Sequence, residues 1–313
     1  MSIAARRIPT RINLALAGAV VVVHVFALIV VPVLRPDAWS IAAALTVAAL
    51  MSPTHWALIH EAIHGMLLPR RVDNERLARL LAILFGVPFR AVRFAHLRHH
   101  RYNRTPWGRE EVYDPAERSR PLAFVLHYGR ITFGLYAGEL GLSMLCWLPR
   151  SVLRRHLVAL CPDPGDGAPG MAAVVDRDVL SPRALAQIRI DAVALVALYA
   201  TAFALCGANW LLLAGMLLVR GFIASQLDHA PHHDTPLDQR DHALNLSAPR
   251  WLRGVLLNFN FHRTHHQHPN LPWRSLPAHS DVHPADISFA RGVLRQWRGP
   301  LALRDAGVVA ERA

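Results

Sequence analysis

The sequence contains no lysine, so all 34 of its basic residues are arginine. A GC-rich coding bias would give the same result, and we attach no function to it. Cysteine is also scarce, because Cys146, Cys161 and Cys206 are scattered, odd in number and form no C-x-x-C pair. These cysteines therefore predict neither a disulfide framework nor an iron–sulfur site. The sequence contains no recognisable motif for a flavin, nicotinamide or haem cofactor. Electrons for any redox reaction of this chain would therefore come from a separate carrier protein.

The charge of the chain is strongly basic, with a formal net charge of +12. No stacking module or recognition helix appears, and long apolar runs argue against a nucleic-acid partner. Anionic lipid headgroups are the partner that this charge favours. The hydrophobic fraction of 53% and the mean hydropathy of +0.23 are high for a soluble enzyme and low for a bundle made only of membrane helices. The composition therefore predicts a membrane part that carries a substantial polar cap.

Four apolar runs predict membrane-spanning helices. They occupy residues 12–34, 39–59, 190–206 and 210–227. Short links at 35–38 and 207–209 join the runs in pairs, so we expect two antiparallel hairpins. Residues 1–11 and 281–313 would then be tails on the arginine-rich side of the membrane. The positive-inside rule makes that side cytoplasmic, and we expect an integral protein of a bacterial inner membrane.

Two further apolar stretches are too short or too polar for a simple span. Leu80 to Phe89 is too short to cross and predicts an interfacial or buried helix. Residues 121–148 contain charged residues and predict either a poor span or a helical hairpin in the interface. The predicted fold class is all-α, with residues 12–280 forming one membrane domain of two transmembrane hairpins and a cytoplasmic helical cap.

Histidines gather in three clusters, which we call boxes. Positions i, i+3 and i+4 lie on one face of a helix, so the imidazoles of each box are expected to converge on one point. Buried imidazoles need partners, and neutral imidazole binds iron, copper or zinc. The boxes therefore predict a metal site. Box 1 holds His60 and His64, box 2 holds His96, His99 and His100, and box 3 holds His262, His265 and His266.

A fourth cluster, His229, His232 and His233, follows the last apolar run. Helical geometry is expected to continue from that run through His229. Pro231 disfavours helix at Ala230 and is expected to end or bend the helix there. We therefore expect His229 to be the ninth ligand, while His232 and His233 remain alternatives.

The identity of the metal is open at this point. Glu61 stands in a formal match to the zinc protease pattern H-E-x-x-H, in which the glutamate is the general base. A single zinc needs only one more ligand and a water, which leaves two boxes unexplained, so eight or nine histidines suit two metals better. Imidazole alone does not separate iron, copper and zinc. A metal transporter fits less well, because the histidines stand at helix ends and in the cap.

The boxes and the paired apolar runs resemble the integral-membrane fatty acid desaturases. Their wider superfamily includes carotenoid ketolases and hydroxylases. Two segments are locally similar to this family: His60-Glu-Ala-Ile-His-Gly65 and His265-His-Gln-His-Pro-Asn-Leu-Pro-Trp273. The resemblance covers about residues 40–280. It implies two iron ions, with O2 as co-substrate. The implied ligands are the eight box histidines and His229, with Glu61 and Asp228 as groups that orient ring nitrogens.

The resemblance also implies a reaction. Hydrogen is removed from an unactivated C–H bond of a lipid, and loss of a second hydrogen gives an alkene whereas return of oxygen gives an alcohol. We expect a fatty acyl desaturase. The alternatives are a hydroxylase or ketolase that acts on a carotenoid or other lipid, and less favourably a zinc membrane protease.

The electron donor would be a ferredoxin, a rubredoxin or a cytochrome b5-type protein. Its docking face is expected to include Arg98, Arg101 and Arg104. A solvated arginine face that holds lipid headgroups is an equal alternative.

Overall fold

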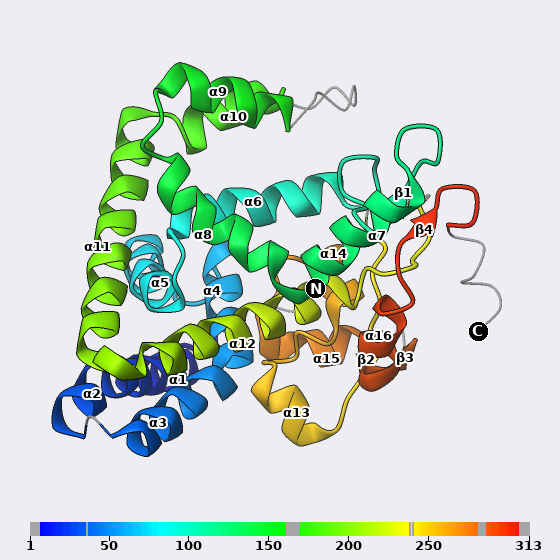
Figure 1. Ribbon diagram of the computed structural model, residues 1–313. Helices are drawn as coiled ribbons and strands as arrows, with labels where there is room; N and C mark the ends of the chain where they lie inside the picture. Colours follow the sequence, from blue (N-terminus) through cyan, green and yellow to red (C-terminus); the bar gives the residue numbers. More distant parts are fainter. Residues whose placement is uncertain are drawn as a thin grey trace.

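The computed structural model describes residues 7–35, 37–160, 170–237, 239, 241–280 and 286–306. Over these residues the protein is mostly helical, and its few strands are two residues long (Figure 1). The predicted helical class therefore holds. Cys146 and Cys206 are buried free thiols, while Cys161 lies outside the described residues.

The N-terminal helices follow the first two predicted spans. The elements are α1 (Thr10–Val25), η2 (Phe26–Val30), α2 (Val31–Leu34), α3 (Ala38–Leu50) and α4 (Ser52–Ile63). The first three form one helix from Thr10 to Leu34, in which η2 is a π-helical turn. Between α3 and α4 the axis bends by 43°. Pro53 has no N–H and lies in the first turn of α4, which explains the bend.

The next two helices place box 2 next to box 1. They are α5 (Arg71–Phe85) and α6 (Phe89–Tyr102), and their axes differ by 96°. Gly86 ends α5 with φ +105°, a conformation that glycine adopts without strain. The stretch Leu80 to Phe89 is thus the end of α5, a sharp turn and the first residue of α6.

The middle of the chain forms one helical stretch and a small outer pair. The stretch consists of α7 (Arg120–Gly129), η3 (Arg130–Gly134) and α8 (Leu135–Leu145), and the outer pair of α9 (Arg150–Ala159) and α10 (Met171–Asp178). A Cβ atom at Gly221 would collide with the ring of Phe133, so a glycine is needed where η3 packs against the following span. The stretch from α7 to α8 is not among the described helices that are long and apolar enough to cross a membrane.

The last two apolar runs form α11 (Pro182–Cys206) and α12 (Trp210–His229), with the single turn η4 (Gly207–Asn209) between them. Ser181 caps α11 by accepting a hydrogen bond from the N–H of Ala184. In Figure 1 the two helices leave the turn in different directions. The turn lies in the same corner of the molecule as the end of α2 and the start of α3 (Figure 1), and apolar residues of all four helices pack together there.

The C-terminal part contains short elements. They are α13 (Arg250–Val255), α14 (His262–Gln267), η5 (Trp273–Ser275), α15 (Leu276–His279) and α16 (Phe289–Gln296). Strand β1 (Val112–Tyr113) pairs in parallel with β4 (Leu301–Ala302), and β2 (Leu246–Ser247) pairs in parallel with β3 (Ile287–Ser288). Residues 286–306, expected as part of a tail, are therefore folded onto the body.

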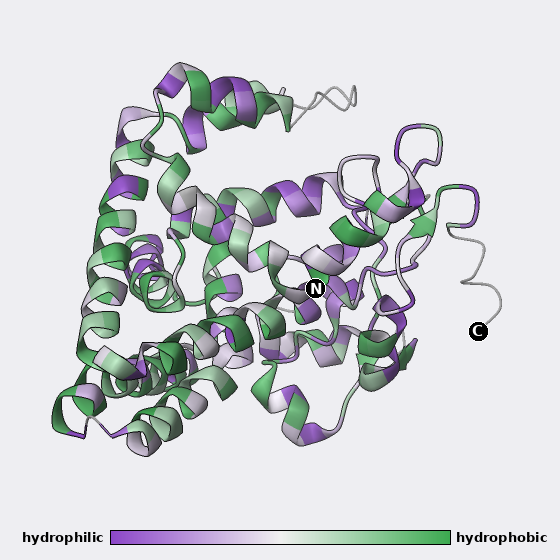
Figure 2. Cartoon of the chain, in the orientation of Figure 1, coloured by the Kyte–Doolittle hydropathy of each residue, from purple (hydrophilic) through white to green (hydrophobic). Residues whose placement is uncertain are grey.

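The outer surface of the long helices is apolar. Two helical segments, Thr10–Leu34 and Pro182–His229, are long and apolar enough to cross a membrane, and there are up to four spans if each bent pair of helices counts as one. Figure 2 shows mostly hydrophobic residues along α1, α3 and α12 and hydrophilic ones along the end of α6. Apolar surface of this extent indicates contact with lipid. Its exposed side chains include Val22, Leu34, Trp39, Leu50, Val193 and Leu211.

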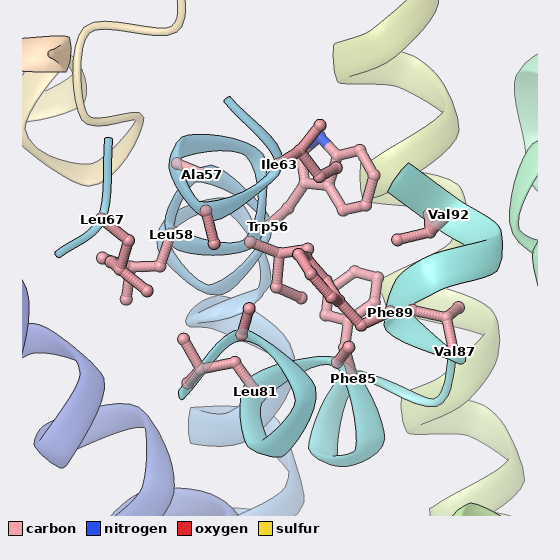
Figure 3. Packing of buried hydrophobic residues seen from close by; sticks show 14 of the residues in the cluster. Trp56, Ala57, Leu58, Ile63, Leu67, Leu81, Phe85, Val87, Phe89 and Val92 are labelled. Atoms are coloured by element: carbon pink, nitrogen blue, oxygen red, sulfur yellow. The ribbon is translucent and has the colours of Figure 1, made fainter. Parts of the chain in front are cut away.

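A hydrophobic cluster lies beneath boxes 1 and 2 and fixes the helices that carry them. Trp56 and Ile63 of α4 pack with Phe85 of α5 and with Phe89 and Val92 of α6 (Figure 3). All five side chains are at most 4% exposed. Close packing of this kind holds α4 and α6 in one relative position, and their histidines with them.

Candidate metal centre

Five imidazoles form a first group. Their ligand atoms all lie within 4.8 Å of one another. The Nε2 atom of His96 lies 3.1 Å from that of His64 and 3.1 Å from that of His100. The Nε2 atom of His265 lies 3.1 Å from that of His100, and the Nε2 atom of His60 is buried without a hydrogen-bond partner. Helices α4, α6 and α14 therefore supply this group together.

Four imidazoles form a second group under the same limit of 4.8 Å: His99, His232, His262 and His266. The Nε2 atom of His232 lies 3.1 Å from that of His99 and 2.9 Å from that of His262. The Nε2 atom of His266 lies 3.1 Å from that of His262. The two groups adjoin, because the ring of His100 stacks on that of His266 with centroids 4.2 Å apart.

The expectation that each triple box converges on one point is wrong. In α6, His96 and His100 belong to the first group and His99 to the second. In α14, His262 and His266 belong to the second group and His265 to the first. A helix turns by about 100° per residue, so positions i and i+4 differ by about 40° whereas i+3 lies about 60° to the other side. The H-x-x-H-H spacing therefore divides its imidazoles between two centres.

In the fourth cluster, the structure places His232 and not His229 in the second group. His229 lies outside both groups, and its ring packs against those of His127 and His233, with centroids 5.3 and 6.0 Å away. Helix α12 continues through His229 and ends there, as expected, but Ala230 keeps helical dihedral angles (φ −55°, ψ −40°) and the chain turns tightly. The N–H of His232 donates to the carbonyl of His229 at 3.1 Å. This tight turn carries His232 round to face the second group.

The imidazoles of box 3 are held in their neutral form. Burial lowers the pKa of His262, His265 and His266 well below the usual value, and nearby imidazoles lower it further. Burial does the same to the pKa of His232. A neutral imidazole keeps a lone pair on one ring nitrogen, which is the form that binds metals.

The spacing of the nitrogens suits metal ions. A metal that binds imidazole at about 2.0–2.1 Å separates its ligand atoms by about 3–3.5 Å. The Nε2 atoms of His64, His96, His100 and His265 follow one another at 3.1 Å. A neutral imidazole has only one N–H, so such a set of contacts cannot consist of hydrogen bonds alone. The residues present therefore fit two metal ions, one in each group.

A buried ion pair, which no sequence pattern indicated, holds the turn that carries His232. Arg104 donates to Glu111 at 2.6 Å, and both side chains are 1% exposed. The same guanidinium donates to the carbonyls of His232, Thr235 and Pro236 at 3.1–3.3 Å. Arg104 was expected on an exposed docking face, and its burial in this pair corrects that expectation.

Residues 36–298 match the sequence model of the family described as Fatty acid desaturase. This match covers more than half of the chain. The chain belongs to the fatty acid desaturase family. No curated protein matches it.

Within this desaturase-family chain, Glu61 and Asp228 stand beside the imidazoles in different ways. Glu61 is buried, and its Oε2 accepts a hydrogen bond from the backbone N–H of Trp273 at 3.1 Å. This bond ties the end of α4 to the loop after α14. Asp228 lies close enough to His99 to favour the charged form of that imidazole. Arg130 and Glu110, which form an ion pair of 3.2 Å, also lie close enough to act electrostatically on His99.

Proposed function

We propose that this member of the fatty acid desaturase family is an oxygen-dependent, membrane-bound di-iron oxidoreductase that introduces a double bond into a fatty acyl chain. Family membership and the helices apolar enough to cross a membrane support a lipid-modifying enzyme at the membrane. The observation that carries the proposal is the pair of adjoining imidazole groups, which contain five and four histidines. A zinc protease needs three protein ligands and one metal, whereas this set suits two.

Two bound irons would supply oxygen activation and the removal of hydrogen from a C–H bond. The chain's own residues supply the rest. We propose His60, His64, His96, His100 and His265 as ligands of one iron and His99, His232, His262 and His266 as ligands of the other. Asp228 would orient the ring of His99. Six of the nine imidazoles are buried, which would limit the access of water, and α4, α6 and α14 would position the substrate relative to the metals.

Metal content and lipid products together test this function. We expect the purified full-length protein to contain two irons per chain, and host lipids to gain an acyl double bond when it is expressed. A hydroxylated or ketonic lipid product would favour the alternative oxidation. One zinc per chain with no lipid change would reject the proposal in favour of a hydrolase that uses Glu61.

The topology of the chain is a separate proposal. We propose that residues 12–280 form the membrane domain, with spans at 12–34, 39–59, 190–206 and 210–227 and with both tails in the cytoplasm. In support, the turn at 207–209 lies in the same corner of the molecule as the end of α2 and the start of α3, away from α14 and the end of α6 (Figure 1). The arginine-rich segments lie near the imidazoles, as the positive-inside rule requires of a cytoplasmic face.

Reporter fusions test this topology. A reporter active only outside the cytoplasm is expected to work when inserted at 35–38 or 207–209 and to fail at the C-terminus. A C-terminal fusion that reports export would overturn the orientation of the spans and their number together.

A further inference from the structure

A basic cavity of about 730 Å³ opens onto the imidazoles between α6, α10 and the end of α14. Its wall includes His100 from the first imidazole group and His266 from the second. These are the two stacked rings at the junction of the groups. A ligand in this cavity therefore reaches both groups at once. Six arginines line it: Arg71, Arg90, Arg93, Arg98, Arg101 and Arg177.

Acidic partners neutralise only part of this charge. Arg90 pairs with Glu75 at 2.7 Å, and Arg177 pairs with Asp178 at 2.8 Å. Arg98 donates to the carbonyls of Leu160 and Trp107. Among the described residues, Arg71 and Arg93 form no ion pair, so they leave positive charge in the wall of this cavity.

Arg93 is the centre of this charge. Its Nε atom is buried and has no hydrogen-bond partner in the described part of the chain. Arg71 and Arg90 lie close enough to oppose its positive charge, whereas Glu75 and Asp178, which form their ion pairs with Arg90 and Arg177, favour it from a greater distance. An unsatisfied buried donor is costly. An anion placed against Arg93 and Arg71 would remove that cost.

We propose that this cavity binds the phosphate group of a phosphate-bearing ligand, with Arg93 as its central donor. The inference rests on the proposed function, because the ligand would be the polar head of the lipid substrate. A phosphate offers several oxygens to guanidinium forks and carries the charge that several arginines can share. A docked acidic protein fits less well, because the Nε atom of Arg93 is buried in a concave wall that carboxylate side chains of a flat partner do not reach.

Phosphate binding by the full-length protein tests the site. The protein, purified in neutral detergent, is titrated calorimetrically with inorganic phosphate and with glycerol 3-phosphate, and its metal content is measured before and after. We expect saturable binding that weakens about tenfold in Arg93→Gln, the effect of one charge-assisted hydrogen bond. Arg155→Gln is the matched control, because it removes an exposed arginine of α9 that lies outside the cavity. It is expected to bind as the parent protein does.

A second arm identifies the source of the phosphate. The titration is repeated in phosphatidylcholine vesicles with and without phosphatidic acid. Competition by phosphatidic acid in the parent protein assigns the site to a lipid headgroup, and its absence assigns a soluble phosphate-bearing ligand.

Three outcomes would overturn the inference. They are no saturable phosphate binding, equal binding by the parent protein and Arg93→Gln, and an acidic protein that binds in an Arg93-dependent way where phosphate does not bind. Zinc in place of iron together with Arg93-dependent phosphate binding would reject the proposed function and leave the anion site in place.

Discussion

His232→Ala is expected to lose about half of the bound iron and all lipid oxidation, whereas His229→Ala is expected to keep two irons per chain. His232 contributes its Nε2 atom to the second imidazole group, where it lies within 3.1 Å of two other ring nitrogens. Its removal leaves that group with three imidazoles. His229 is buried nearby but belongs to neither group. Both variants remove one buried imidazole from the same turn, so they are matched in burial and place.

Iron per chain and lipid product, measured on both variants and on His233→Ala, decide the assignment. The Nε2 atom of His233 contacts the carbonyl of Gly299 at 3.0 Å, so this variant reports the cost of loosening the C-terminal segment without removing a member of either group. Full iron in His232→Ala together with loss of iron in His229→Ala would contradict the geometry of the turn.

Arg104→Met is expected to lower the free energy of unfolding by about 3–5 kcal/mol, because it leaves the carboxylate of Glu111 buried without its partner. The same change removes a donor from the carbonyls of His232 and Thr235. We therefore also expect weaker binding of metal by the second imidazole group than by the first. Denaturant unfolding in detergent and iron titration measure the two effects.

Two comparisons separate the causes of this loss. In the double variant Arg104→Met/Glu111→Leu, neither charge of this pair remains. Part of the lost free energy of unfolding should therefore return, while the weakened metal binding persists. Arg154→Met removes one partner of the ion pair with Asp176, whose two side chains are 49% and 35% exposed, and should leave stability unchanged. Equal stability of the parent protein and Arg104→Met would show that the buried pair contributes nothing to the fold.

The family could be predicted from the sequence, because the spacing of histidines within each box is a local property. Positions i and i+4 lie about 40° apart around a helix and i+3 lies about 60° to the other side, so the spacing alone does not show how many centres a box serves. The match of residues 36–298 agrees with the family resemblance drawn from these boxes. The predicted spans also appear as helices, because long apolar runs have few alternatives.

What the sequence could not give depends on contacts between distant segments. The division of boxes 2 and 3 between two groups requires α6 and α14 to face one another. The choice of His232 over His229 depended on Ala230, which stays helical before a proline although that conformation is disfavoured. The bonds of Arg104 to the 232–236 turn, which hold this local geometry, join residues about 130 positions apart in the chain.

The shared boxes have a consequence for assembly. Because α6 and α14 each give imidazoles to both groups, every bound metal would cross-link segments that are far apart in sequence, such as residues 60 and 265. A cross-link of this kind closes long loops and so lowers the entropy of the unfolded chain. The two metals would share the same two helices, so loading of one group would pre-align the other. The second iron is therefore expected to bind more tightly than the first, and the apoprotein should lose its order first at α14.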